Sequence, residues 1–380
     1  MTHSDTATGP GSLSPAPSVR QPRFQWAVGP AVPILSVVIA LAFGAIFVLL
    51  SGNDPVAAYA ALLQGAFGTP YDVTETMVSA IPLILTGISV AIAFRTGLFN
   101  IGAQGQLLVG ALTAGWAGSQ FASLPGVVLM PLVILFGIAG GAFYGGIAGF
   151  LKAARGVNEV ITTIMLNYTI VFVMHWLLQG GPMTAQNALG TPASTPIGAG
   201  ARLPVIVPNE LVPFSRLHGG LILAALAVVF FWFLLWRTPV GYRLRAVGLG
   251  ARAAAQAGID PARHMVLVMA IAGGFAGLGG MIEVSGVFGR VYDGFSSSYG
   301  FDAIAVALLG KNSPIGIVLA AFLFGAFVHG GAYMQSHAGI SSNLVAIIQA
   351  FVLFVIAAEA LVRGLTRRRW RSAKLAEVIA

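Results

Sequence analysis

The sequence predicts an all-α, polytopic membrane protein with about nine to ten transmembrane or re-entrant helices and both chain ends in the cytoplasm. Three observations support this fold class. Hydrophobic residues make up 57% of the 380 residues and charged residues 8%, against about 25% charged residues in an ordinary soluble protein. Apolar runs of about 20 residues, long enough to span a bilayer, recur along the chain. The basic residues gather between these runs, as in proteins that cross a membrane many times.

The expected helices follow one another with mostly short connections. Residues 56–68 are predicted to form an interfacial helix on the outer face. Residues 295–310 are too few and too polar at their start to cross a bilayer, which indicates a broken or re-entrant element. The other apolar runs are predicted spans, at about 27–50, 73–94, 100–118, 126–150, 159–179, 219–236, 264–288, 314–334 and 341–362.

The distribution of charge predicts the orientation of this bundle. Cytoplasmic loops of membrane proteins carry an excess of Lys and Arg. If both chain ends are cytoplasmic, every Lys and Arg except Arg202, Arg216 and Arg290 lies on the cytoplasmic side. The same topology makes 180–218 a long external loop and 237–263 a long cytoplasmic loop.

Composition also divides the chain into a membrane domain and two tails. Residues 27–363 are expected to form one transmembrane domain. Residues 1–26 are polar and rich in Pro and Ser, without the apolar core of a signal peptide, so we expect a disordered cytoplasmic tail. Residues 364–380 are predicted to form a basic cytoplasmic tail.

Glycines at four-residue intervals indicate helix contacts inside the membrane. Small residues at this spacing let helix backbones approach closely where no hydrophobic drive exists. We therefore expect the 126–150 and 264–288 helices to pack tightly along their glycine faces, and a glycine-lined translocation path is the alternative. The glycines are Gly137, Gly141, Gly145, Gly149, Gly273 and Gly277.

Neutral polar residues at membrane depth are the candidate lining of a solute path. Polar side chains are costly at that depth, so each needs a partner or a function. Amides and hydroxyls without net charge suit a neutral, hydroxyl-rich solute, and hydrogen bonding between helices is the alternative role. A helix from residue 100 would place Asn100 and Gln104 on one face and Gln106 on another. The candidates are Asn100, Gln104, Gln106, Asn167 and Tyr168.

Several other classes of function lack support. The chain has no cysteine, which excludes disulfides and thiolate metal sites, and its histidines lack the spacing of metal ligands. Gly310-Lys311 lacks the spacing of a nucleotide-binding P-loop, and no hydrolase motif is present. We therefore expect no catalytic residue, no metal and no cofactor. An ion-coupled secondary transporter stays open, because Glu283 or Asp302 could bind a proton or a sodium ion.

The loop 237–263 is a basic, helix-prone segment between two apolar runs. It carries five arginines against a single acid, Asp260. Such charge lies outside the hydrocarbon, in the cytoplasm, and the loop is long enough to form a short helix. A basic helical loop in this position indicates docking to a cytoplasmic protein. The positive-inside rule accounts for the formal net charge of +8, so we expect no nucleic-acid partner.

Three stretches of the sequence carry a resemblance to a known family. They are 93–106, which contains FNIGAQGQ; 156–168, which contains EVITTIMLNY; and the loop segment 241–260. Together they resemble the permease subunits of bacterial ABC importers in the sugar, nucleoside and branched-chain amino acid branch. Permeases for purine nucleosides are the most similar, and the resemblance extends over about residues 27–363.

The resemblance implies a function and a set of partners. A permease of this kind would sit in the bacterial plasma membrane, conduct a neutral nucleoside-like solute inward and hydrolyse no ATP itself, with a ribose- or galactose-type sugar as the alternative solute. Its implied partners are a cytoplasmic ABC ATPase subunit, a second homologous permease subunit, an external substrate-binding lipoprotein and the lipid bilayer. The residues implied to couple it to the ATPase are Arg243, Arg245, Arg252, Gln256 and Asp260.

Overall fold

The computed structural model describes residues 25–185, 191–295 and 298–355. In this part of the chain the architecture is helical, and extended backbone pairs only in isolated bridges within loops. The predicted all-α, polytopic fold is confirmed. The predicted tail 364–380 and nearly all of the tail 1–26 lie outside the described residues.

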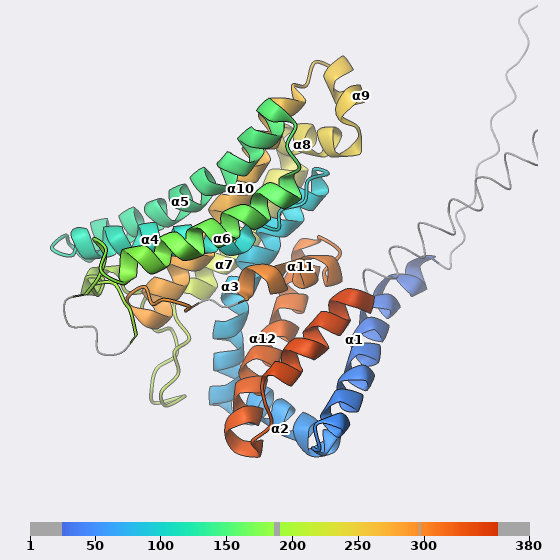
Figure 1. Ribbon diagram of the computed structural model, residues 1–380, viewed down its shortest axis with the longest axis vertical. Helices are drawn as coiled ribbons and strands as arrows, with labels where there is room; N and C mark the ends of the chain where they lie inside the picture. Colours follow the sequence, from blue (N-terminus) through green and yellow to red (C-terminus); the bar gives the residue numbers. More distant parts are fainter. Residues whose placement is uncertain (1–24, 186–190, 296–297, 356–380) are drawn as a thin grey trace, which may run out of the picture.

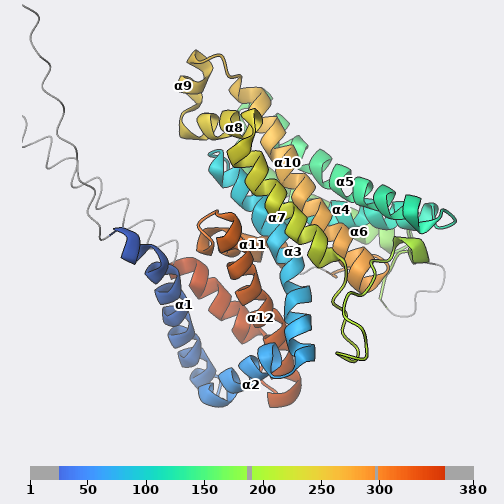
Figure 2. The same ribbon diagram turned by 180° about the vertical axis from the view of Figure 1, so that it is seen from behind.

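The helices form two groups that share α3 (Pro70–Arg95), as Figures 1 and 2 show from opposite sides. The first group contains α4 (Ala103–Gln120), α5 (Gly126–Arg155), α6 (Glu159–Leu178), α7 (Gly220–Arg237) and α10 (Pro261–Ile282). The second group contains α1 (Gln25–Leu50), α2 (Pro55–Phe67), α11 (Tyr299–Leu309), α12 (Pro314–Ala338) and the helix Asn343–Val355. Because α3 packs against α10 on one side and α12 on the other, it is the most enclosed of the long helices.

Six helices of the described part are long and apolar enough to cross a membrane. They are α3, α5, α6, α7, α12 and α10, the last with the π-helical turn Glu283–Phe288 that continues it. Their bounds lie within a few residues of predicted spans. α11 has 11 residues and is about 16 Å long, roughly half the hydrocarbon thickness, so it ends inside the bundle.

α4 differs from the predicted span at 100–118 in two respects. It begins at Ala103, after a turn, and its glutamines make it too polar to count among the six spanning helices. It is nevertheless enclosed, because α3, α5, α6 and α10 all pack against it. A helix that faces protein on all sides needs no continuous apolar surface toward lipid.

Polar caps and prolines define where the helices begin. Thr69, directly before Pro70, and Asp72 form a reciprocal capping box at the start of α3. Asp260 accepts hydrogen bonds from two backbone N–H groups at the start of α10, which has Pro261 as its first residue. These side chains satisfy N–H groups that have no partner inside a helix. Proline fits the first helical position because it lacks an N–H.

The predicted glycine faces of α5 and α10 pack directly against each other. A Cβ atom added at Gly141 would lie 2.7 Å from the Cα of Gly277, and one added at Gly149 would lie 2.9 Å from the Cα of Val266. Such distances leave no room for a side chain between the helices. The prediction of tight packing is confirmed, and the backbone contact explains why glycine occupies these positions.

The two short helices α8 (Pro239–Leu249) and α9 (Ala251–Gln256) project from one end of the first group (Figure 1). We call this end, together with Arg95, the basic end. α8 lies on the turn after α3, where a Cβ atom at Gly248 would sit 2.6 Å from the carbonyl oxygen of Arg95. The Arg95 side chain donates from Nε to the carbonyl of Asn312, 3.1 Å away. The basic end therefore ties the α3–α4 turn, the α11–α12 turn and α8 together.

Candidate functional site

Asn100 and Gln106 pair with each other inside the bundle. Asn100 Nδ2 donates to Gln106 Oε1, and Gln106 Nε2 donates to Asn100 Oδ1, each at 2.9 Å. Asn100 also donates to Ser89 Oγ on α3 at 3.1 Å. Asn100 precedes α4 rather than belonging to it, so the helical spacing that assigned Asn100 and Gln104 to one face does not apply. The structure pairs Asn100 with Gln106 instead and buries both.

Asn167 joins the middle of α6 to the start of α4. Its Oδ1 accepts a hydrogen bond from Gly105 N at 2.8 Å, and its Nδ2 donates to the carbonyl of Ile101 at 2.9 Å. A Cβ atom at residue 105 would lie 2.8 Å from this Asn167 oxygen, so glycine is required for the approach. Gln104 Oε1 accepts from Gly300 N at 2.8 Å and ties α4 to α11. Two amides thus connect three helices at membrane depth.

A cavity of about 440 Å³ lies beside these amides, between α4 and α6. Its volume falls within the range of small-molecule sites. Tyr168 and Phe301 are 61% and 44% exposed, so both rings can contact a solute. The lining residues are Ile101, Gln104, Leu108, Ile164, Asn167, Tyr168, Val171, Met174, Asp293, Gly294 and Phe301.

The structure therefore divides the five predicted lining residues. Gln104, Asn167 and Tyr168 lie together at the cavity. Asn100 and Gln106 do not line the cavity and hydrogen-bond to each other in the interior of the bundle. The lining is mostly apolar, with two neutral amides, Gln104 and Asn167, and two aromatic rings, Tyr168 and Phe301. Such a surface can hydrogen-bond and stack against a neutral solute, and it offers no cation for a phosphate.

The sequence reading missed one charged group at the cavity, Asp293. Its carboxylate Oδ2 lies 2.7 Å from Nδ1 of His175, in the last turn of α6. Asp293 comes from the loop after α10, where Gly294 adopts a φ of +75°. An Asp-Gly pair indicates a turn, but nothing in the sequence indicates a partner 118 residues away.

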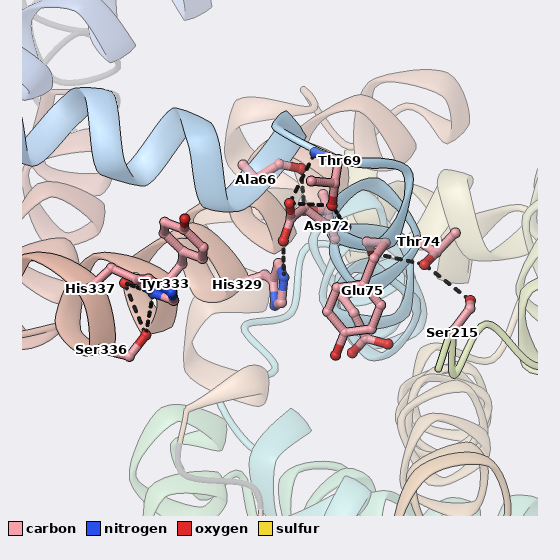
Figure 3. Close-up of polar contacts among 12 residues, drawn as sticks. Ala66, Thr69, Asp72, Thr74, Glu75, Ser215, His329, Tyr333, Ser336 and His337 are labelled. Atoms are coloured by element: carbon pink, nitrogen blue, oxygen red, sulfur yellow. Dashed lines mark hydrogen bonds and ion pairs between the residues drawn. The ribbon is translucent and has the colours of Figure 1, made fainter. Parts of the chain in front are cut away.

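A second polar cluster lies at the end of the bundle opposite the basic end. Figure 3 shows Asp72 between Thr69 and His329, whose Nε2 is 3.5 Å from the Asp72 carboxylate. Thr74 accepts a hydrogen bond from Ser215 at 3.0 Å. These contacts fasten the start of α3 to α12 and to the loop that precedes α7. The cluster serves the fold, because the cavity lining includes none of its members.

The loop before α7 is anchored by charge. The guanidinium and the backbone N–H of Arg216 both bind the buried carboxylate of Glu75 on α3. Hydrogen bonding to Glu75 raises the pKa of Arg216 above its ordinary value. Two residues further on, burial lowers the pKa of His218 to about 4, so its imidazole is neutral at pH 7 and accepts from Gly220 N. The sequence indicates only that Arg216 lies outside the cytoplasmic group of basic residues, and it does not indicate this partner.

The surface of α8 and α9 carries the predicted coupling residues. Arg243, Arg252 and Gln256 are exposed, whereas Arg245 is half-buried against the body of the bundle. Asp260 caps α10 and pairs with Arg263 at 3.2 Å. Two large side chains that were not predicted are also exposed here, Tyr242 (63%) and Leu249 (92%). An exposed surface with both arginine and large apolar side chains is typical of a protein docking site.

Comparison with known proteins gives consistent matches. A family model described as "Branched-chain amino acid transport system / permease component" matches residues 73–357. The guanosine ABC transporter permease protein NupP of Bacillus subtilis is 39% identical over 333 residues, covering 87% of this chain and 94% of that protein. No solved structure matches the chain.

Two further relatives match at similar levels. The glucose ABC transporter permease protein TsgB13 of Haloferax volcanii is 39% identical over 334 residues, covering 86% of this chain and 87% of that protein. The nucleoside ABC transporter permease protein NupB of Lactococcus lactis subsp. cremoris is 38% identical over 330 residues, covering 86% and 90% respectively.

Proposed function

The chain belongs to the permease family of the branched-chain amino acid transport system, and from this membership we propose that it forms the membrane path for a neutral nucleoside. It is an ABC importer permease and a multi-pass membrane protein. Its relatives are permease subunits, which are not themselves enzymes. The family resemblance read from the sequence is confirmed. Membership also argues against the ion-coupled secondary transporter that Glu283 and Asp302 had left open.

The cavity between α4 and α6 is the observation that carries the nucleoside proposal. Asn167 retains one amide hydrogen and one oxygen lone pair beyond its two bonds to the protein, so it can bind a base edge or a hydroxyl. Gln104 lies beside it, and Tyr168 and Phe301 offer rings on which a base can stack. No Lys or Arg lines the cavity in the described part of the chain, which favours a nucleoside over a nucleotide. The relatives named for guanosine and nucleosides agree with this solute class.

A sugar is the second candidate solute, because one relative of equal identity is named as a glucose permease. Sugars and nucleosides need the same hydrogen-bonding amides. They differ in the flat base, which requires an aromatic surface beyond the amides. The exposure of both Tyr168 and Phe301 at the cavity therefore favours the nucleoside.

The basic end is the proposed docking surface for the ATPase. By the positive-inside rule this end faces the cytoplasm of a bacterial cell, with the plasma membrane as the location of the protein. A separate cassette subunit would bind α8 and α9 through Arg243, Arg245, Arg252 and Gln256, hydrolyse ATP and move the helices attached to this end. A second permease subunit and an external binding lipoprotein would complete the importer.

Competition for uptake tests the solute class. Cells that express the complete transporter should take up radiolabelled guanosine, and unlabelled adenosine should compete, while ribose, galactose and glucose at the same concentration should not. Cells without the permease gene supply the background. Competition by sugars with no competition by nucleosides would contradict the nucleoside proposal and leave the permease function intact.

A further inference from the structure

We propose that Asp293 recognises the vicinal hydroxyl groups of the ribose on the transported nucleoside, and that His175 positions its carboxylate for this role. The inference rests on the proposed function and names a specificity residue for it. It starts from the placement of Asp293, the single charged group among the described residues that line the cavity.

Both the side chain and the backbone of Asp293 are held in place by hydrogen bonds. His175 Nδ1 lies 2.7 Å from Oδ2, and the Asp293 backbone N–H donates to the carbonyl of Pro192 at 3.0 Å. The neighbouring Tyr292 forms an isolated bridge with Ala193, which fixes the loop further. A carboxylate with a fixed backbone and one fixed oxygen has a defined direction, so it is pre-organised for a ligand.

The other carboxylate oxygen, Oδ1, makes no hydrogen bond within the described part of the chain. A carboxylate accepts hydrogen bonds and donates none, so it selects donors on the solute. Two adjacent hydroxyls are a donor pair that every ribonucleoside carries, whatever its base, and carboxylates bind ribose hydroxyls in the dinucleotide-binding folds. A hydrogen bond to a charged acceptor also contributes more than one to an amide.

The positions of the other lining residues are consistent with a nucleoside whose ribose lies at Asp293. Asp293 lies near the last turn of α6, where His175 is found, whereas Gln104 lies in the first turn of α4. Those two turns are at opposite ends of the cavity, because α4 starts at the basic end. A nucleoside could then place its ribose at Asp293 and its base between Tyr168, Phe301 and the amides. The ribose would be the part nearest the proposed external side.

The alternative role for the pair is structural: it could only fasten the loop to α6. Substitution of Asp293 by Asn separates the two roles, because the shape is retained and the charge is lost. The measurement is the ratio of guanosine uptake to 2′,3′-dideoxyguanosine uptake, in cells with the same ATPase and binding lipoprotein. Any selectivity of the lipoprotein cancels when variant and wild type are compared.

The Asp293→Asn variant should lower this ratio by about tenfold, since the ribonucleoside loses a charge-assisted bond that the dideoxy compound never makes. His175→Ala retains the carboxylate but frees it, so it should lower the ratio by less. Glu210→Gln removes an exposed acid elsewhere in the external segment and should leave the ratio unchanged.

An equal loss of uptake for both solutes in Asp293→Asn, with normal amounts of protein in the membrane, would overturn the inference and support the structural role. If Asp293→Asn does not accumulate, His175→Ala decides by the same ratio. Absence of guanosine uptake by the wild-type transporter would instead contradict the proposed solute class.

Discussion

At the scale of single residues, the amides of this protein perform two different tasks. Asn100 and Gln106 hydrogen-bond to each other, and Asn100 also hydrogen-bonds to Ser89, so the pair holds α4 against α3. Gln104 and Asn167 hold the backbone of neighbouring helices while also facing the cavity. Side chains of the same type therefore stabilise helix packing at Asn100 and Gln106 and are candidate binding groups at Gln104 and Asn167.

Removal of one partner of the Asn100–Gln106 pair should destabilise the protein. Asn100→Leu or Gln106→Leu leaves a buried amide without its partner, at a cost of about 1–2 kcal/mol in the free energy of unfolding. The double Leu variant should lose less than the sum of the two, because no orphaned amide remains. Thermal unfolding of the purified protein in detergent measures all three variants.

A matched control is Asn53→Leu, whose side chain bonds only within an exposed turn. It should leave the midpoint temperature nearly unchanged. Strictly additive losses in the Asn100 and Gln106 variants would show that the two side chains act independently.

At the scale of helices, the α5–α10 contact determines which substitutions the first group of helices can accommodate. The two backbones touch along the faces of Gly137, Gly141 and Gly145 on α5 and of Gly273 and Gly277 on α10. The closeness gives van der Waals contact over a long surface, which drives helix association inside lipid. At Gly141, Gly273 and Gly277 the nearest atoms belong to the backbone of the other helix, so no rotamer change can accommodate an added methyl group there.

Gly141→Ala should therefore destabilise the bundle, whereas Gly146→Ala on the same helix should not. The new methyl group at residue 141 would overlap the backbone of Gly273 and Gly277, which we expect to cost about 1–3 kcal/mol. The nearest atom to a methyl group at residue 146 is the Cβ of Ala270, at an ordinary 3.8 Å. The measurement is the midpoint of thermal unfolding in detergent, and equal midpoints for the two variants would contradict the contact.

At the scale of the whole molecule, the basic end connects the two groups of helices. α8 rests on the turn after α3, and α3 belongs to both groups of helices. A force applied to α8 by a docked protein would reach both groups through this one helix. The arrangement suits a permease whose energy arrives from a separate subunit.

Gly248→Ala should uncouple the docking surface from the bundle. A methyl group at residue 248 would lie 2.6 Å from the Arg95 carbonyl oxygen, so α8 must shift away from α3. We expect reduced co-purification of the ATPase subunit and reduced uptake, with normal insertion into the membrane. Gly250→Ala is the control, because its methyl group would meet only Ala253, at 3.8 Å. Unchanged uptake in Gly248→Ala would exclude this contact from coupling.

Much of the architecture could be predicted from the sequence, because a bilayer fixes helix length and excludes charge from the spans. The glycine faces were also predictable, since helical spacing alone defines them. The pairs Glu75–Arg216 and His175–Asp293 were not, because hydropathy and spacing give no distance between helices. Helical spacing predicts Asn100 on the same helix face as Gln104, but the structure places Asn100 in the turn before α4.

The Glu75–Arg216 contact has a consequence for the biosynthesis of the protein. α3 is synthesised early, yet the cation that neutralises its buried carboxylate comes 141 residues later. At a synthesis rate of about 5–20 residues per second, roughly 7–28 s pass between the two. During that interval α3 carries an unpaired acid that lipid cannot solvate. We therefore expect the nascent helix to stay in contact with water or with the insertion machinery until the segment that contains Arg216 has been synthesised.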